Sequence, residues 1–545
     1  MIAPFGNCAG AARDAAAAPK PSARSASRRV QWTGLEFDGI MRVKRSPAYR
    51  IARDFTPSPD GDMIAAMRFA SALAFSFALI VAPITSAATS PAAIDSFISR
   101  YQELGLFNGS ALVADQGQVI FQKGYGLANM EWNIPNTPDT KFRMGSMTKQ
   151  FTATLILQLV EQGKLDLKAP ITRYLPDYPT HSGDRITIHH LLNHTSGIPG
   201  YTEIPAWASK MREPYPPAKF VELFSKMELF FDPGTRFSYS NSGYFLLGVI
   251  LEKVAGQPYE KLLRERIFVP VGMNDTGYDS TRPLLTKRAS GYDKTFDGSY
   301  VNTSYIDMSQ PYAAGSLYST VEDFYRWDQA LYTDRILSAA SKERMFTPGL
   351  SNYGYGWQIA KKEGVTTIEH GGGINGFNSL ITRNPESKRL VVLLNNTGAA
   401  PLNAIVSGVH AILDGKQPVL PKQLAAPELF KTYQKSGLDA ALRQAKEMKS
   451  GTQYNAGEGE LTRLGGEILS ISKTDGLTLA RQLAADEPKS IGAVILLARA
   501  EQANGHRVEA IQAWSKAIEL SSTPRALLVY TDEIRQLSTL DAAAK

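Results

Sequence analysis

The sequence predicts an α+β domain followed by an all-α region. Two strand-like runs, Ser110–Asp115 and Gln118–Gly124, precede a long stretch of loops and short helices. Three more strand-like runs follow that stretch, so we expect one sheet built from both ends of the domain and layered with helices. After Gln417–Pro427 the composition becomes typical of helices. The three later strands are expected at Thr366–His370, Phe377–Thr382 and Arg389–Asn395.

The overall composition excludes several classes of protein. The chain has 545 residues, of which 43% are hydrophobic and 20% charged, and these are ordinary globular values. Much of the net charge of +7 lies near the N-terminus, because residues 1–62 hold ten Lys or Arg and six Asp or Glu. The remainder therefore gives little support to nucleic-acid binding. Cys8 is the single cysteine, which excludes a disulfide scaffold, a zinc-thiolate site and a cysteine nucleophile.

A segment near the N-terminus has the features of a secretory signal. Arg68 is followed by an apolar stretch of fourteen residues, Phe69–Ala82, and by the small residues Thr85-Ser86-Ala87. A membrane span is the alternative, but the stretch is shorter than the ~20 residues required. We therefore predict a signal peptide at 63–87 and a periplasmic or secreted protein. No cysteine follows the cleavage site, so no stable membrane anchor is expected.

Four parts of the chain are expected. Residues 1–62 precede a segment that should begin the chain, so they are predicted to be a disordered, non-native leader before the signal peptide. The α+β domain is expected at 92–415 and a helical domain at 425–545. Within the helical domain, Ile491–Leu520 has the residue spacing of a tetratricopeptide helix pair, with Asn504-Gly505 at its turn. A plain helical hairpin is the alternative.

A helix is expected from Ser146 to about Gly163, and an S-x-x-K motif opens it. The spacing of three places the Lys149 ammonium one turn along the same face as the Ser146 hydroxyl. The helix N-terminus also offers free backbone N–H groups beside that hydroxyl. The motif alone is weak, because Ser470-Ile471-Ser472-Lys473 also fits it. Shorter helices are expected at Tyr244–Ala255 and Val321–Leu331.

Tyr239-Ser240-Asn241 supplies a phenol and an amide near a turn. A tyrosine close to a cation can ionise below its free pKa of ~10, and the phenolate can then accept a serine proton. Tyr300-Val301-Asn302 matches the same Y-x-N pattern. The surrounding segment FDPGTRFSYSNSGYFLLG is what favours Tyr239.

His370-Gly371-Gly372-Gly373 closes a predicted strand. Glycines there allow a close approach of the backbone to a ligand. His370 can donate a hydrogen bond or carry a positive charge, and with a pKa of ~6.5 it should be largely charged at pH 5.5 and mainly neutral at pH 8. A flexible turn at the end of the strand is the alternative interpretation.

Taken in order across 92–415, these three motifs resemble those of the serine β-lactamase and penicillin-binding-protein family, especially its class C and D-alanyl-D-alanine carboxypeptidase branch. The segments ITIHHLLNHTSGIPGY, PYAAGSLYSTVEDFYRWDQAL and HGGGINGFNS are similar to that family too. The resemblance implies an antiparallel five-stranded sheet flanked by helices, with a helical subdomain. It implies Ser146 as nucleophile, Lys149 and Tyr239 as the proton-handling pair, and Asn241, His370, Gly372 and Gly373 as substrate or oxyanion contacts, with N–H groups of Ser146 and Gly373 forming the oxyanion hole.

One position departs from the lactamases, which usually have Lys-Thr-Gly where this chain has His370-Gly371-Gly372. A permanent positive charge for a substrate carboxylate is thereby replaced by one mostly lost at pH 7. Carboxypeptidase or esterase activity is therefore favoured over efficient β-lactam hydrolysis. Whether Lys149 or Tyr239 removes the first proton is left open by the motifs.

The sequence thus predicts an exported serine hydrolase that uses a Ser146 acyl-enzyme, without metal or cofactor, on D-alanyl peptides, small esters or β-lactams. A Ser-His-Asp hydrolase is disfavoured because no G-x-S-x-G segment occurs. The alternative is a catalytically inactive relative that binds peptidoglycan fragments, or a protein partner through its helical tail. A metal site is disfavoured because no H-E-x-x-H spacing accompanies the clustered histidines, which are His181, His189, His190 and His194.

Overall fold

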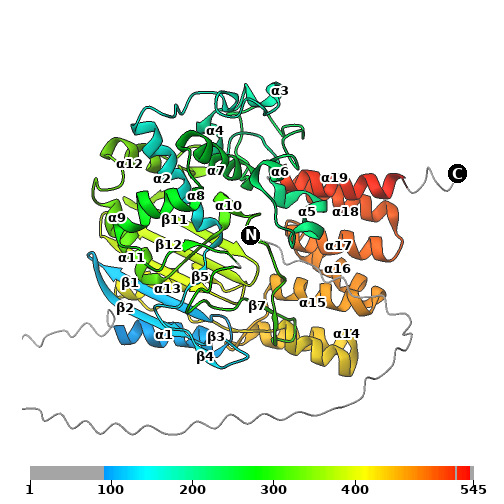
Figure 1. The fold of residues 1–545 in the computed structure, drawn as a ribbon. Helices are drawn as coiled ribbons and strands as arrows, with labels where there is room; N and C mark the ends of the chain where they lie inside the picture. Colours follow the sequence, from blue (N-terminus) through cyan, green and yellow to red (C-terminus); the bar gives the residue numbers. More distant parts are fainter. Residues whose placement is uncertain (1–90, 281, 522–523, 540–545) are drawn as a thin grey trace, which may run out of the picture. The chain divides into compact units, whose positions relative to one another are not determined.

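A six-stranded antiparallel sheet forms the α+β domain's framework (Figure 1). The computed structural model describes residues 91–280, 282–521 and 524–539. The strand order is β10-β11-β12-β13-β1-β2, so the sheet is built from both ends of the domain, as predicted. The strands are β1 (Gly109–Asp115), β2 (Gln118–Tyr125), β10 (Gln358–Lys362), β11 (Val365–Ile374), β12 (Phe377–Asn384) and β13 (Arg389–Asn395).

The predicted number of five strands is too low, because the structure has β10 at one edge of the sheet. Its residues read QIAKK, and Ile359 is its one buried side chain. Lysines are typical of edge strands, where they discourage pairing with other chains. Such a short strand carries too little hydrophobic alternation to be predicted from the sequence.

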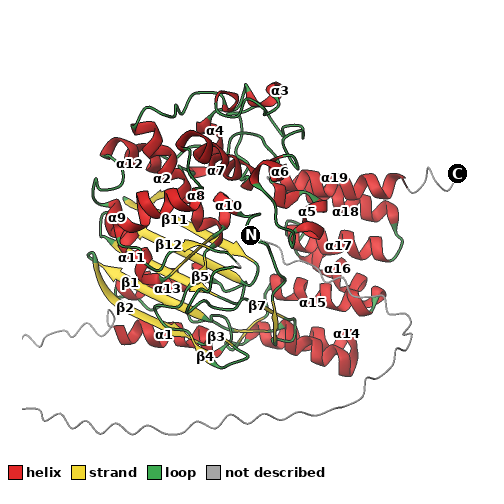
Figure 2. Cartoon of the chain, in the orientation of Figure 1, coloured by secondary structure: helices red, strands yellow, loops and turns green. Residues whose placement is uncertain are grey.

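Helices cover both faces of the sheet (Figure 2). Side chains alternate along β1, so that Ala111 and Val113 join one hydrophobic core while Leu112 and Ala114 join the other. The first core also contains α1 (Pro91–Glu103) and α13 (Leu402–Leu413). The second and larger core contains α2 (Thr148–Glu161), α7 (Asn241–Ala255) and α11 (Val321–Leu331). The predicted α+β class is confirmed.

Helix α2 lies deep in the larger core. Every residue from 148 to 157 is buried, and the helix packs against α7 and α10 (Tyr312–Gly315). The predicted start at Ser146 falls instead in the single 3-10 turn η2 (Gly145–Met147), which leads directly into α2. Lys149, in the first turn of α2, is therefore shielded from solvent.

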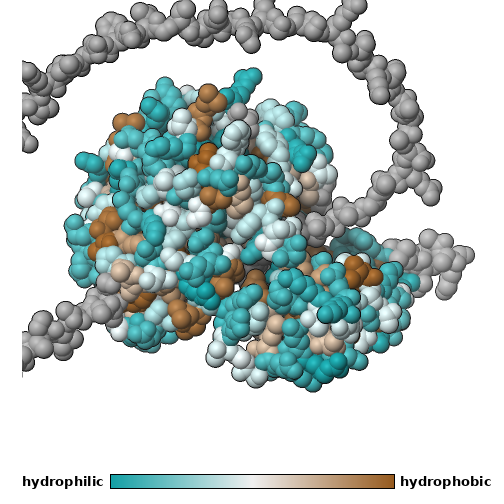
Figure 3. All heavy atoms as spheres, turned by 90° about the horizontal axis from the view of Figure 1, so that it is seen from below, coloured by the Kyte–Doolittle hydropathy of each residue, from teal (hydrophilic) through white to brown (hydrophobic). Residues whose placement is uncertain are grey.

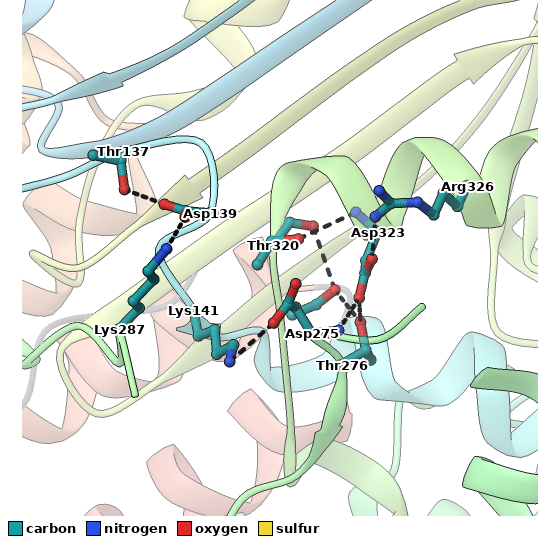
Figure 4. Close-up of polar contacts among 10 residues, drawn as sticks. Thr137, Asp139, Lys141, Asp275, Thr276, Lys287, Thr320, Asp323 and Arg326 are labelled. Carbon is teal, nitrogen blue, oxygen red and sulfur yellow. Dashed lines mark hydrogen bonds and ion pairs between the residues drawn. The ribbon is translucent and has the colours of Figure 1, made fainter. Parts of the chain in front are cut away.

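Ion pairs anchor the segment that leads into α2 (Figure 4). Asp323 is fully buried in the first turn of α11, where it accepts the Asp275 backbone N–H and the Thr276 hydroxyl, each at 2.8 Å. It also pairs with Arg326 at 2.5 Å. Lys141 in turn pairs with Asp275 at 3.0 Å. The segment that precedes α2 is thus connected to α11 through Asp275.

The C-terminal region is helical, as predicted, apart from the two-residue strand β15 (Tyr454–Asn455). Asn504-Gly505 forms the turn between α17 and α18, and Gly505 adopts a positive φ of 80°. A tetratricopeptide assignment for this hairpin stays a prediction. The Arg463 guanidinium donates to the Phe296 carbonyl oxygen at 3.2 Å, which links the region to the α+β domain. The helices are α14 (Ala426–Ser450), α15 (Glu458–Ile471), α16 (Lys473–Asp486), α17 (Ile491–Ala503), α18 (Arg507–Leu520) and α19 (Pro524–Thr539).

The predicted leader at 1–62 and signal peptide at 63–87 lie outside the described residues. Within the described ranges, no helix combines the length and apolarity that crossing a bilayer requires. On the face drawn in Figure 3, hydrophobic side chains are scattered among hydrophilic ones.

Candidate active site

Glycines bring the Ser146 turn against strand β11. Gly145 adopts a positive φ of 52°, and a Cβ at this residue would lie 2.8 Å from the backbone nitrogen of Gly373. A Cβ at Gly372 would lie 1.9 Å from the carbonyl oxygen of Met144. Both contacts are too short for any side chain, so the two backbones can meet only because glycine occupies both positions.

Lys149 reaches Ser146 from the first turn of α2. Its Nζ atom lies 3.0 Å from the Ser146 Oγ atom, 2.8 Å from the Asn241 Oδ1 atom and 2.8 Å from the Ala314 carbonyl oxygen. The side chain is 0% exposed. Among the described residues no carboxylate pairs with it, and burial holds the pKa of Lys149 well below its ordinary value.

Tyr239 lies beside the same pair. Its ring centroid is 4.9 Å from the Lys149 Nζ atom, and the Ser146 hydroxyl is near enough to lower the pKa of the phenol. Burial raises the pKa of Tyr239 above the ordinary tyrosine value, and the Ser146 hydroxyl offsets only part of that increase. The sequence-based interpretation that this phenol ionises more easily is therefore wrong in direction. Desolvation of the phenolate outweighs the neighbouring amine.

Asn241 is the first residue of α7 and is held from both ends of its amide. Its Oδ1 atom accepts from Lys149 at 2.8 Å, and its Nδ2 atom donates to the Thr202 hydroxyl at 3.3 Å. The preceding Ser240 caps α7 by accepting the Gly243 N–H at 3.3 Å. The cap fixes where α7 begins, and so fixes Asn241 next to Lys149. A contact of this amide with substrate stays a prediction.

His370 lies in the middle of β11 and is only 7% exposed. The prediction that the strand closes at His370 is wrong, because the following glycines continue its pairing with β12. Its Nε2 atom is 2.8 Å from the Tyr353 hydroxyl, and its Nδ1 atom is 2.6 Å from the Gly371 carbonyl oxygen. Burial lowers the pKa of His370 to about 3. The expectation of a charged ring at pH 5.5 is therefore wrong. Both ring nitrogens face protein atoms, which the sequence pattern gives no means of predicting.

The chance matches to the motifs assemble nothing comparable. Ser470 lies in α15, is exposed, and donates to the Glu467 carbonyl oxygen at 2.7 Å. Lys473 begins the next helix and is also exposed. Tyr300 lies in the short strand β8 (Tyr300–Asn302), which pairs with β7 (Tyr292–Lys294).

The clustered histidines have separate surroundings. His189 and His190 line a cavity of about 490 Å³ together with Arg344 and Tyr353, and Ser146 is not part of that lining. His194 instead lies in the core, 1% exposed. Within the part of the chain that the structure describes, no group of three or more His, Cys, Asp or Glu side chains is placed to hold a metal ion.

The motifs miss three groups, which contact Lys149, His370 and Tyr239 respectively. The Ala314 carbonyl contributes only backbone, although the segment that contains it was already noted for its family resemblance. Tyr353 binds His370 through its hydroxyl, and nothing in its local sequence predicts this. His194 packs its ring 4.2 Å from that of Tyr239, measured between centroids. Each depends on contacts between residues far apart in the chain.

Known proteins are similar to this chain in both sequence and fold. A protein-family model described as Beta-lactamase matches residues 94–406. The chain belongs to this family, which confirms the resemblance found in the sequence. It is 36% identical over 321 residues to the protein named "Putative penicillin-binding protein PbpX" of Bacillus subtilis (strain 168), a match covering 58% of this chain and 78% of that protein.

Two solved structures are similar at comparable identity. A penicillin-binding protein from Bacillus halodurans aligns with a TM-score of 0.53 and 30% identity, covering 58% of this chain and 99% of that chain. The D-amino acid amidase from Ochrobactrum anthropi SV3 aligns with a TM-score of 0.51 and 30% identity, covering 59% of this chain and 96% of that chain. The relatives thus include penicillin-binding proteins and an amidase of the same fold.

Proposed function

We propose that the protein is a serine hydrolase that cleaves esters or amides through an acyl-enzyme on Ser146. The observation that carries this proposal is the buried Lys149 amine, 3.0 Å from the Ser146 hydroxyl oxygen. An ammonium at that position would be desolvated with only neutral oxygens as partners, which favours the uncharged amine. An uncharged amine beside a hydroxyl can act as its general base.

The hydrogen bonds of Lys149 support this role. A neutral amine has two N–H donors and one lone pair. The Asn241 Oδ1 atom and the Ala314 carbonyl oxygen, both at 2.8 Å, match the two donors. The lone pair is then left for the proton of the Ser146 hydroxyl. Lys149 is accordingly the base for acylation, and Tyr239, whose pKa is raised, is the proton donor.

The proposed sequence of steps conserves each proton. The Ser146 Oγ atom bonds to the carbonyl carbon while its proton moves to the Lys149 Nζ atom. The oxyanion accepts the backbone N–H groups of Ser146 and Gly373, which the close approach of Gly145 to Gly373 favours. Collapse of the tetrahedral intermediate breaks the bond to the leaving group, which accepts the Tyr239 proton. Lys149 then returns to Tyr239 the proton that it took from Ser146. Water then hydrolyses the ester formed on Ser146.

The neutral His370 narrows the proposed substrates. Without a cation at this position, a substrate gains no charge-assisted contact for a terminal carboxylate from this strand. Small esters and amides, including amides of D-amino acids, are therefore favoured over β-lactams and free-acid peptides. The similarity to a D-amino acid amidase supports the amide part of this proposal. The signal-like segment at 63–87 supports a site of action outside the cytoplasm.

Covalent labelling tests the proposal. A fluorescent fluorophosphonate should label the wild-type protein and the Ser470→Ala control equally, and should not label Ser146→Ala. Hydrolysis of p-nitrophenyl acetate and D-phenylalanine amide should follow the same pattern. Labelling that persists in Ser146→Ala would refute the assignment of the nucleophile.

A further inference from the structure

Tyr239 lies in a loop just before α7, outside any helix or strand. Regular backbone hydrogen bonds therefore do not fix its direction. Its phenol must nevertheless point at Ser146 for the proposed chemistry, and a small misplacement of a reacting group costs a large part of the rate. Contacts from residues outside the loop must therefore orient the Tyr239 side chain.

His194 contacts the chain on both sides of Tyr239. Its carbonyl oxygen accepts the Ser238 backbone N–H at 2.9 Å. Its Nδ1 atom accepts the Ser240 backbone N–H at 3.1 Å. Its ring also lies against the Tyr239 ring, with 4.2 Å between centroids and 36° between the planes. One residue thus holds the tyrosine from both neighbours and from the face of its ring.

His194 is itself rigidly placed. It has a positive φ of 61°, which few residues other than glycine adopt, although histidine is among the more tolerant. Its ring is 1% exposed and also contacts the rings of Tyr244 and Tyr353, at 5.1 and 4.7 Å between centroids. Packed in this way, the imidazole has little freedom to move, and it can transmit its position to the loop.

The protonation of His194 fits a positioning role. Because Nδ1 accepts a backbone N–H, the ring proton is on Nε2, and Nε2 is buried with no hydrogen-bond partner among the described residues. Burial holds the pKa of His194 well below its ordinary value. A ring that stays neutral and has no partner at Nε2 is poorly suited to carry protons.

We propose that His194 is the positioning residue for Tyr239, and that the acceptor at its Nδ1 atom directs the phenol toward Ser146. The inference rests on the proposed function, in which Tyr239 donates the proton to the leaving group. It predicts that the acceptor matters more than the aromatic ring.

Two substitutions separate acceptor from ring. His194→Phe keeps an aromatic ring and removes the acceptor, so kcat per titrated active site should fall about 100-fold with KM changed less than about threefold. In His194→Asn the amide oxygen can accept the Ser240 N–H, and asparagine tolerates the positive φ. The kcat of His194→Asn should therefore be at least about tenfold higher than that of His194→Phe. His189→Phe, an exposed histidine of α4 (Ile188–Leu192), is the matched control and should keep wild-type kcat.

A double-mutant cycle with Tyr239→Phe gives the decisive readout. If His194 acts through Tyr239, adding His194→Phe or His194→Asn to Tyr239→Phe should change kcat less than about twofold. A merely structural role would lower kcat by the same factor in both backgrounds, which would overturn the proposal. If His194→Phe does not fold, the His194→Asn cycle decides in the same way. Failure of the proposed function would appear separately, as activity retained in Ser146→Ala.

Discussion

The chain contains the same S-x-x-K pattern twice, with opposite outcomes. At Ser146 the lysine three residues on is fully buried and contacts the hydroxyl at 3.0 Å. At Ser470 the pattern spans the end of one helix and the start of the next, and both Ser470 and Lys473 are exposed. An exposed ammonium keeps its charge and cannot act as a base at neutral pH. The difference shows that burial, more than spacing, turns this tetrapeptide into a candidate active site.

The largest difference in kcat is expected between Ser146→Ala and Ser470→Ala. Ser146→Ala should lower kcat for p-nitrophenyl acetate by about 10⁴-fold or more, because the covalent route depends on that oxygen. Its unfolding free energy should change by about 1 kcal/mol, the range for losing one hydrogen bond. Ser470→Ala should leave both quantities unchanged. Equal losses of kcat in the two variants would contradict the assignment of Ser146 as the nucleophile.

The paired lysine substitutions should have the next largest effect. Lys149→Met keeps the length of the side chain and removes the base, so kcat should fall by about 10²–10⁴-fold. Stability should be kept or raised, because a desolvated amine is replaced by an apolar group. Lys473→Met should be silent in both assays. Wild-type kcat in Lys149→Met would assign the base to another group.

Acid should destabilise the folded site through His370, which faces Lys149, the Tyr353 hydroxyl and the Gly371 carbonyl oxygen. Its folded pKa of about 3 lies below the unfolded value of ~6.5. Between these values the unfolded chain binds a proton that the folded one does not. Stability is therefore full above pH ~6.5 and should fall by up to ~1.4 kcal/mol per pH unit as the pH drops.

Urea unfolding from pH 4.5 to 8 would measure this slope. His194, also buried with a lowered pKa, should contribute in the same direction. His370→Asn should therefore reduce the slope without abolishing it. An unchanged slope would mean that His370 is protonated alike in both states. Affinity of Ser146→Ala for a substrate ending in a carboxylate should be flat from pH 5.5 to 8, since the ring stays neutral.

Removing the C-terminal helices should have the smallest effect on chemistry. A chain ending near residue 424 keeps all three motifs, so ester hydrolysis should stay within about threefold of the full chain. The contact of Arg463 with Phe296 predicts a modest loss of stability instead. Thermal unfolding and kcat of the two chains would test both statements. Loss of soluble protein would show that the helices belong to the folding unit.

Much of the fold follows from local sequence signals. Helix α11 begins and ends at the predicted residues, because Thr320 caps it and its apolar residues repeat at helical spacing. The five predicted strands each have clear hydrophobic runs and turns. The two wrong predictions of pKa, for Tyr239 and His370, share one cause. Desolvation depends on packing by residues such as Tyr353, whose ring lies near those of both Tyr239 and His370 and which belongs to none of the three motifs.

The proposed role of Lys149 as an uncharged general base is tested most directly by measuring the charge of Lys149. Lysine labelled with ¹³C at Cε reports ionisation by its NMR chemical shift, and the Lys149 signal can be assigned by its absence in Lys149→Met. We expect Lys149 to be a neutral amine at pH 8, because burial holds its pKa well below the ordinary value. An ammonium at Lys149 that titrates near the ordinary value of ~10.4 would contradict it.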